Sequence, residues 1–349
     1  MTHARCGAFV ISLDFELYWG LRDVRPLDRA LRRYLLAARE AIPHLLDILH
    51  ERDFRATWAT VGFLFARDRE ELIAHVPDLL PTYADATLSP YTDLRFLGPD
   101  EERDPFHFAP SLIEQIFRTP GQELGSHTFS HFYALARGQT QSQFAADLRA
   151  AATIGRRFGN VVSSLVLPRN QWNPAYLPAM RDAGVRSVRV NRSHWAYAPS
   201  ARAHDPTSHR AFRLVDSALP LSGHLDTAWP ADLGAPWRQT ASAFHRVTNA
   251  RFPLLDRLSR LRLVRGVAEA ARKRRTFHIW CHPHNFGAHP GTLDSFRRLL
   301  DEVDIIRRRH RLRSLTMSEL LEAAALPPEF DERDLERDLE HNNSSERKL

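Results

Sequence analysis

Short apolar runs alternate along this sequence with longer stretches of helical periodicity, and this alternation most limits the folds that the chain can adopt. The apolar runs are rich in β-branched residues, which is typical of buried strands. They read AFVISLDF, RATWATVGF, VSSLVLPRN, VRSVRVN and TFHIWCH. Helical periodicity separates several of them, for example over residues 27–52 and 141–158. Strands that alternate with helices predict an α/β protein with a largely parallel sheet.

Two segments stand apart from this alternation. Residues 76–110 are rich in proline and aspartate, and we expect an insert-like loop that would suit a lid or a specificity loop. Residues 327–349 are highly charged and have no apolar face wide enough for a core, so they are expected to form a charged C-terminal tail. The total of 349 residues suits one barrel-sized domain with insertions or two ordinary domains.

Cysteine usage and the apolar runs bear on where the protein works. Cys6 and Cys281 stand far apart, which excludes a disulfide framework and a multi-cysteine zinc site and favours a reducing compartment. Asp14 and Glu16 interrupt the apolar N-terminal run, and no small-residue cleavage site follows. No apolar run approaches the roughly 20 residues that span a bilayer. We therefore expect a cytoplasmic protein.

The formal net charge of +6 comes mostly from arginine, and residues 246–275 concentrate that charge among leucines at helix-like spacing. One interpretation of this segment is a solvated helix face. The other is a surface that makes peripheral contact with anionic membrane lipid or binds a phosphate-bearing substrate. Nucleic acid is not an expected partner, because the arginines are not interleaved with the aromatic residues that stack on bases.

Polar side chains stand where the apolar runs end. Asp14, His127, Arg169, Asn191 and His282 each lie at or just beyond such an end. A βα barrel gathers its catalytic side chains at the carboxyl ends of its strands. We therefore expect these five side chains to converge.

The first of these motifs contains two acids. A period of two places Asp14 and Glu16 on one side of the first strand and Phe15 on the other. Carboxylates so close together repel each other, so one of them gains from a metal ion or a proton. The alternative is that one acid caps a turn and the other is solvated.

The stretch ELGSHTFSHFY places His127 and His131 four residues apart. A helix, or an irregular turn, can direct both imidazoles at one metal ion. A chain with 18 histidines also produces this spacing by chance. The neighbouring Thr128 and Ser130 could supply hydrogen bonds that fix the orientation of the rings.

Two later motifs add an arginine and a third histidine. Arg169 in LVLPRNQW is a planar cation suited to holding a carboxylate, or else a surface arginine. If FHIWCH is a strand, His278, Trp280 and His282 share a face, which makes His282 a candidate acid beside a hydrophobic wall. Cys281 would face the opposite way and is expected to be a buried thiol.

In this order, SLDFE, SHTFSH, LPRNQWN and HIWCHPHNF resemble the motifs of the polysaccharide deacetylases, carbohydrate esterase family 4, which share the NodB homology domain. The resemblance covers roughly residues 7–322. It implies a distorted (β/α)7 barrel over residues 1–326. It also implies a hydrolase that uses a divalent metal ion, with Zn2+ expected, to cleave an N-acetyl amide on a sugar.

The resemblance also implies residue roles. By motif order, Asp14 is the catalytic base, and the metal ligands are Glu16, His127 and His131. The family usually has two adjacent aspartates at the first motif, whereas Phe15 separates the two acids here, so the reverse assignment of Asp14 and Glu16 stays open.

The remaining roles fall on the later motifs. Arg169 corresponds to the arginine that orients the base, and His282 to the histidine that protonates the leaving amine. The acid that tunes this histidine has no clear counterpart, and Asp216 is the candidate. His284 has no role by this resemblance.

The products implied are acetate and a free amino sugar, formed during cell-surface polysaccharide biosynthesis. Since no export signal is expected, the substrate would be a nucleotide-linked, lipid-linked or oligomeric N-acetyl sugar. Two alternatives remain open: a metal-independent hydrolase of a cyclic amide in a non-sugar metabolite, and a non-catalytic glycan-binding protein.

Overall fold

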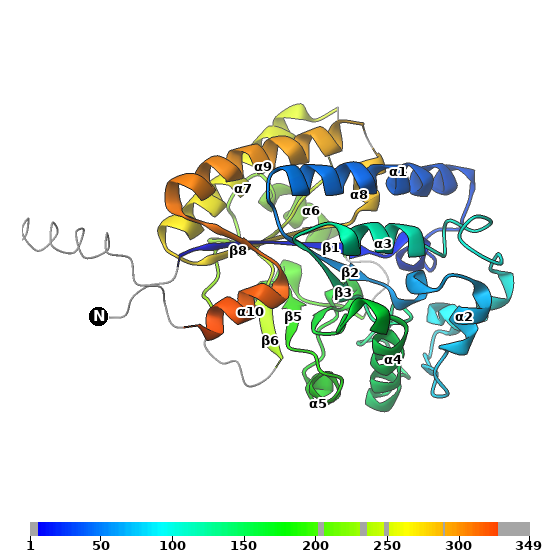
Figure 1. Cartoon of the computed structure of the whole chain (residues 1–349). Coiled ribbons are helices and arrows are strands. Elements are labelled where there is room, and N and C mark those ends of the chain that lie inside the picture. The colour runs from blue at the N-terminus through cyan, green and yellow to red at the C-terminus, as the bar shows by residue number, and fades with distance from the viewer. Residues whose placement is uncertain (1–5, 202–205, 231–235, 248–250, 289, 327–349) are drawn as a thin grey trace, which may run out of the picture.

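The computed structural model describes residues 6–201, 206–230, 236–247, 251–288 and 290–326 (Figure 1). The charged tail expected at residues 327–349 lies outside the described residues. None of the described helices combines the length and the apolar character that crossing a membrane requires.

The described strands form one parallel sheet of nine strands. Its order is β6-β5-β4-β3-β2-β1-β8-β7, and β9 also pairs with β1. The strands are β1 Ala8–Phe15, β2 Ala56–Thr60, β3 Gln122–Ser126, β4 Ser164–Val166, β5 Ser187–Val190, β6 Trp237–Thr240, β7 Ala243–Phe244, β8 Thr276–Cys281 and β9 Arg313–Leu315.

Helices connect these strands, as the alternating pattern predicts. The α-helices are α1 Arg29–Glu51, α2 Arg69–Ala74, α3 Pro110–Arg118, α4 Gln141–Ile154, α5 Leu177–Asp182, α6 Thr207–Asp216, α7 Pro253–Arg272, α8 His284–Ala288, α9 Pro290–His310 and α10 Met317–Ala325. Single turns of 3-10 helix are η1 Leu17–Gly20, η2 Gly62–Phe65, η3 Ala86–Leu88, η4 Pro90–Thr92, η5 Leu94–Phe96, η6 Arg156–Phe158, η7 Pro168–Asn170, η8 Pro174–Tyr176 and η9 Trp195–Tyr197. The loop predicted at residues 76–110 is largely irregular and contains η3, η4 and η5.

The sheet curls into a barrel with a seam between β6 and β7. These two strands lie at opposite ends of the sheet order, yet only Ala241 and Ser242 separate them along the chain. Three Cα steps span at most about 11 Å, so the two edges of the sheet must approach each other. The Ala241 N–H donates to Val190 of β5, and the Ser242 N–H donates to His278 of β8. This linker therefore joins the two edges, and the expected distorted barrel is confirmed.

Strand β1 separates the helical layer from the barrel interior. Phe9, Ile11, Leu13 and Phe15 belong to the large apolar core that is shared with α1, α7 and α9. Figure 1 shows these three helices together on one side of β1. Because side chains alternate along a strand, Ser12 and Asp14 point into the barrel instead, where both contact Arg189. Helix α10 packs on Ala8 and Val10 at the opposite, amino end of β1.

Helix α4 fixes the loop that follows β3. Its Asp147 is buried and accepts hydrogen bonds from the N–H groups of Phe129 and Ser130 and from the Ser130 hydroxyl. Thr128 Oγ1 accepts from the N–H of Phe132 in the same loop. Thr128 and Ser130 therefore fix the loop backbone, whereas the sequence interpretation had them orienting histidine rings.

Burial raises the pKa of Asp147 to about 6, above its ordinary value of 3.8, although the loop donors oppose this shift. The folded protein thus holds this proton more tightly than the unfolded chain, and the carboxyl costs stability as the pH rises from about 4 to about 6. Asp147→Asn cannot titrate. We expect the difference in unfolding free energy, wild type minus Asp147→Asn, to fall by about 3 kcal/mol between about pH 4 and about pH 7. Urea unfolding in excess chelator measures it.

The matched control is Glu40→Gln at an exposed position of α1, which should leave the pH dependence of unfolding as in the wild type. A difference between the wild type and Asp147→Asn that stays constant over this pH range would show that Asp147 titrates like an exposed carboxyl.

Candidate functional site

A cavity of about 830 Å³ opens at the carboxyl ends of the strands. Its volume lies in the range of about 300–1,000 Å³ that is typical of small-molecule sites. The five side chains predicted to converge, Asp14, His127, Arg169, Asn191 and His282, all line it. No residue of the 76–110 loop does.

The two acids of the first motif lie at the end of β1. Asp14 and Glu16 are 3% and 5% exposed and both line the cavity, whereas Phe15 packs in the apolar core on the other side. The predicted alternation is therefore confirmed. Burial on its own would raise the pKa of Glu16, but His282, His127 and His131 together hold it well below its ordinary value.

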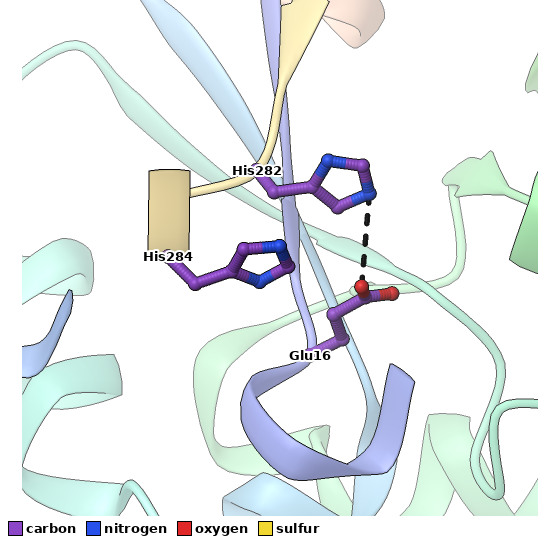
Figure 2. A group of neighbouring side chains, drawn as sticks. All are labelled: Glu16, His282 and His284. Atoms are coloured by element: carbon purple, nitrogen blue, oxygen red, sulfur yellow. Dashed lines mark ion pairs between the residues drawn. The ribbon is translucent and has the colours of Figure 1, made fainter. Parts of the chain in front are cut away.

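Strand β8 brings His282 to the same place (Figure 2). Its Nε2 lies 3.6 Å from Glu16 Oε1 and 3.9 Å from Asp14 Oδ2. Trp280 and Phe244 approach the ring in T-shaped contacts, which provide the predicted hydrophobic wall. His284 stacks on His282 with ring centroids 4.7 Å apart. A histidine between an apolar wall and two carboxylates can carry a proton toward the cavity.

Two other residues of the β8 motif do not line the cavity. His278 is buried with Nε2 2.8 Å from Ser12 Oγ, and burial lowers its pKa to about 3, so its ring is neutral. Cys281 is fully buried, and burial raises the pKa of its thiol well above the ordinary value. The prediction of a buried thiol is therefore confirmed.

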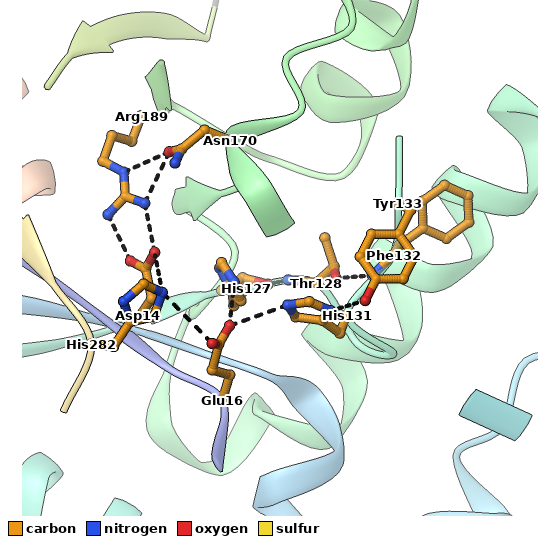
Figure 3. A network of polar contacts seen from close by, with 11 residues as sticks. Asp14, Glu16, His127, Thr128, His131, Phe132, Tyr133, Asn170, Arg189 and His282 are labelled. Carbon is orange, nitrogen blue, oxygen red and sulfur yellow. Dashed lines mark hydrogen bonds and ion pairs between the residues drawn. The ribbon is translucent and has the colours of Figure 1, made fainter. Parts of the chain in front are cut away.

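The loop after β3 directs both histidines of SHTFSH at one carboxylate oxygen (Figure 3). The Nε2 atoms of His127 and His131 lie 3.3 and 3.2 Å from Glu16 Oε2. The segment is irregular, and His131 adopts a positive φ of 58°. Burial lowers the pKa of His131, which favours the neutral imidazole that a metal requires.

These spacings fit a metal ion. In a tetrahedral zinc site with bonds of about 2.0–2.1 Å, the ligand atoms stand about 3.4 Å apart. The distances from Glu16 Oε2 to the two histidine nitrogens meet that spacing within about 0.2 Å, and all three side chains are buried. His127 Nδ1 is buried and has no hydrogen-bond partner in the described residues. His131 Nδ1 lies 3.2 Å from the Tyr133 hydroxyl, which can fix the tautomer of its ring.

A second trio, Glu16, His282 and His284, also lies within reach of one ion. The rings of His282 and His284 are nearly parallel, at 19°, and stacked. The lone pair of an imidazole lies in the plane of its ring, so stacked parallel rings do not aim at one point. The rings of His127 and His131 are inclined at 52°, and the first trio is the better candidate metal centre.

Asp14 takes a different partner from Glu16. Arg189 donates to Asp14 Oδ1 and Oδ2 at 2.6 and 2.7 Å in a bidentate ion pair (Figure 3). The guanidinium also donates to Asn170 Oδ1 and lies 4.4 Å from the centroid of the Trp280 ring. Burial opposes ionisation of Asp14, but Arg189 outweighs it and the pKa of Asp14 lies below its ordinary value.

Sequence reasoning missed Arg189. Its side chain is fully buried in β5, the strand predicted from VRSVRVN. The available signal was a charged residue between Val188 and Val190, inside a run whose neighbours are apolar. Since a buried charge needs a partner, an arginine at this position predicts a carboxylate on a facing strand.

The structure corrects the expected placement of Arg169. Its guanidinium forms an ion pair with Asp23 and lies 4.4 Å from the centroid of the Tyr133 ring, so it does not hold Asp14. Arg169 and Asn170 both adopt positive φ, 53° and 51°. This turn directs Asn170 to Arg189 and leaves Arg169 on the cavity wall beside Asp23.

Asp216, the candidate for tuning the late histidine, lies elsewhere on the cavity wall. It is buried at the end of α6 and accepts hydrogen bonds from Tyr197, Ser222 and Arg262. None of its described partners is His282. The carboxylates that face His282 are those of Asp14 and Glu16.

Comparison with solved structures shows the fold. The chain is similar to a protein from Mycobacterium smegmatis assigned to the polysaccharide deacetylases, with 13% identity, a TM-score of 0.58 and 94% of each chain covered. It is also similar to a 4-alpha-glucanotransferase from Thermococcus litoralis, with 12% identity and a TM-score of 0.51, over 93% of this chain and 41% of that one.

Comparison of sequences finds a family match over part of the chain. No curated protein matches the chain at a significant level. The family model described as Polysaccharide deacetylase matches residues 34–188, a range that contains His127, His131 and Arg169. The resemblance predicted from the motifs is thereby confirmed over this range, and residues 34–188 match the polysaccharide deacetylase domain.

Proposed function

We propose that this protein is a metal-dependent hydrolase that removes the N-acetyl group from an amino sugar during cell-surface polysaccharide biosynthesis. The observation that carries the proposal is the convergence of His127, His131 and Glu16 on one point, next to Asp14 and His282 in the same cavity. The family match over residues 34–188 supports carbohydrate deacetylation as the class of reaction.

The buried trio of Glu16, His127 and His131 would hold a divalent ion, with Zn2+ favoured by two imidazoles and a carboxylate. When bound, such an ion supplies Lewis acidity to the acyl carbonyl and the attacking water. Assigning Glu16 rather than Asp14 as the ligand rests on their partners, because both oxygens of Asp14 are bonded to Arg189.

Asp14 is the proposed general base. The Arg189 ion pair keeps Asp14 ionised, and it fixes the orientation of the carboxylate through two bonds. Each carboxylate oxygen retains a second lone pair that can accept a proton from water as the water attacks the acyl carbon. Arg189, in place of Arg169, is therefore the proposed positioning residue for the base.

His282 is the proposed general acid. Its side chain is 23% exposed, more than Asp14 or Glu16, so its Nε2 can reach a substrate in the cavity. Protonation of the departing nitrogen matters because an amide anion is a very poor leaving group. His282 would hand its proton to that nitrogen, releasing acetate and the free amine.

The decisive experiment is an acetate-release screen with nucleotide-linked, lipid-linked and oligomeric N-acetyl sugars, with and without chelator, alongside metal analysis. We expect turnover that chelation abolishes and one bound ion per chain. Chelator-resistant turnover of a cyclic amide would favour the metal-independent alternative. Turnover that Asp14→Asn removes would dismiss a glycan-binding role without catalysis.

The two arginines can be separated by mutation. Arg189→Gln should lower kcat by about 100-fold or more, because it removes the partner that orients the base, whereas Arg169→Gln should change kcat by less than about 10-fold. Steady-state kinetics on the best substrate of the screen measures both.

A double-mutant cycle distinguishes a positioning role of Arg189 from a loss of activity through misfolding. In an Asp14→Asn background, Arg189→Gln should cost no further activity if Arg189 acts through Asp14. An equal and independent loss in both backgrounds would contradict the positioning role.

Gly20 offers a test of the metal centre that removes no ligand. A Cβ at Gly20 would overlap the carboxyl group of Glu16, which must then swing away from the histidines. Gly20→Ala should therefore weaken metal binding by about 10- to 100-fold, as loss of a supporting contact does. Competition with a chromophoric chelator measures the affinity.

Gly155→Ala is the matched control, since its Cβ would crowd the Val161 side chain at the end of α4, away from the cavity. It should change thermal stability and leave metal affinity unaltered. Unchanged metal affinity in Gly20→Ala would argue against Glu16 as a ligand.

A further inference from the structure

The outer part of the catalytic cavity is lined with arginines that the deacetylation chemistry does not use. They come from the loop after β5, from α6, from the loop after β7 and from α7. They are Arg192, Arg210, Arg213, Arg246, Arg260 and Arg262. The catalytic groups lie on the strand ends of the same cavity, so one molecule can touch both parts.

Positive charge exceeds negative charge on this wall. The acids among the lining residues of α6 and α7 are Asp216 and Asp256, and Glu302 pairs with Arg260 from outside the lining. Among the described residues, the six arginines outnumber these three acids. The basic run at residues 272–275 does not line the cavity. The six arginines of this wall lie earlier in the 246–275 segment, on α6 and in the loop after β5.

Two arginines of this wall, Arg192 and Arg262, are held in place. Arg262 lies 3.2 Å from Asp216, its side chain is 9% exposed, and its Nε is buried without a hydrogen-bond partner in the described residues. Arg192 donates to the Ser222 hydroxyl and to the backbone oxygens of Ser222 and His224. These contacts fix two cationic side chains, and cations fixed in this way bind an anion with little loss of side-chain entropy.

The electrostatic environment also favours an anion. Burial lowers the pKa of Arg192 and of Arg246. Tyr197 and the nearby Asp216 and Asp256 oppose this shift, and Arg262 and Arg213 add to it. The cationic forms of these arginines therefore repel each other and lack full solvation. A bound anion relieves both penalties.

We propose that this arginine wall binds a phosphate group of the substrate, so that the amide cleaved belongs to a phosphorylated N-acyl amino sugar. This inference rests on the proposed deacetylation and names its substrate class. Guanidinium groups match the planar, multidentate geometry of phosphate contacts. The cavity volume leaves room for a phosphate beyond the sugar ring that carries the amide.

The phosphate could belong to a sugar phosphate, a nucleotide or a lipid carrier, and the surface nearby bears on the choice. Leu214 and Val215 of α6, with Phe252 and Leu254 at the start of α7, are exposed large apolar residues. A carrier lipid could contact them while its phosphate meets the arginines. The experiment therefore includes all three phosphate sources.

The test compares acetate release from N-acetylglucosamine with release from its 1-phosphate, its nucleoside diphosphate conjugate and its polyprenyl-phosphate conjugate. The variant is Arg210→Gln/Arg246→Gln, and the control is Arg265→Gln, an exposed α7 arginine outside the cavity. Calorimetric titration of inorganic phosphate into the metal-loaded proteins measures binding without turnover.

We expect the double variant to lose about 10- to 100-fold in kcat/KM on at least one phosphorylated substrate, and in phosphate affinity, with the neutral sugar unaffected. Arg265→Gln should behave as wild type. A preference for the lipid conjugate alone would identify the carrier as the phosphate source.

Equal kcat/KM for neutral and phosphorylated sugars, or phosphate affinity unchanged in the double variant, would overturn the phosphate subsite while deacetylation stands. Phosphate binding that depends on Arg210 and Arg246, with no acetate released from any substrate, would keep the subsite and overturn the proposed reaction.

Discussion

The buried ion pair between Arg189 and Asp14 is the interaction on which the rest of the site depends. Two charges removed from water cost several kcal/mol each unless they are paired and fully hydrogen-bonded. Here the pair is bidentate, and Ser12 and Asn170 accept the remaining donors. These partners come from β1, β5 and the turn after β4, so satisfying one guanidinium fixes three barrel segments relative to one another. The same arrangement leaves Glu16 as the acid that faces the histidines.

The spacing of the two acids explains the shape of the first motif. With Phe15 between them, Asp14 and Glu16 both enter the cavity while Phe15 anchors the strand in the core. The residue at position 16 lies beyond the strand end, and the longer side chain of glutamate reaches back to His127 and His131. That reach needs space at Gly20, where any Cβ would collide with the carboxylate.

The sequence predicted the fold and the three residues of the candidate metal trio, because both depend largely on local pattern. Strand β1 begins and ends at the predicted residues, and α1 lies within the predicted 27–52 stretch. The sequence-based predictions failed where contacts between distant segments determine the structure. Strand β7 has only two residues and is held by its neighbours in space. Arg169 follows one apolar run and Arg189 lies inside the next, and the turn with positive φ after Pro168 leaves Arg169 beside Asp23 while Arg189 meets Asp14.

The seam of the barrel connects the catalytic end to the arginine wall. Because Ala241 and Ser242 carry the chain from one sheet edge to the other, the segment that follows runs along the cavity and places Phe244 against His282 and Arg246 on the wall. A regular closed barrel would fill that position with a full strand. The short strands at the seam therefore do two things at once: they complete the apolar side of His282 and bring cationic side chains into the cavity that holds the carboxylates. Opposite charges then occupy separate parts of one site, as the proposed substrate with its neutral amide and anionic group requires.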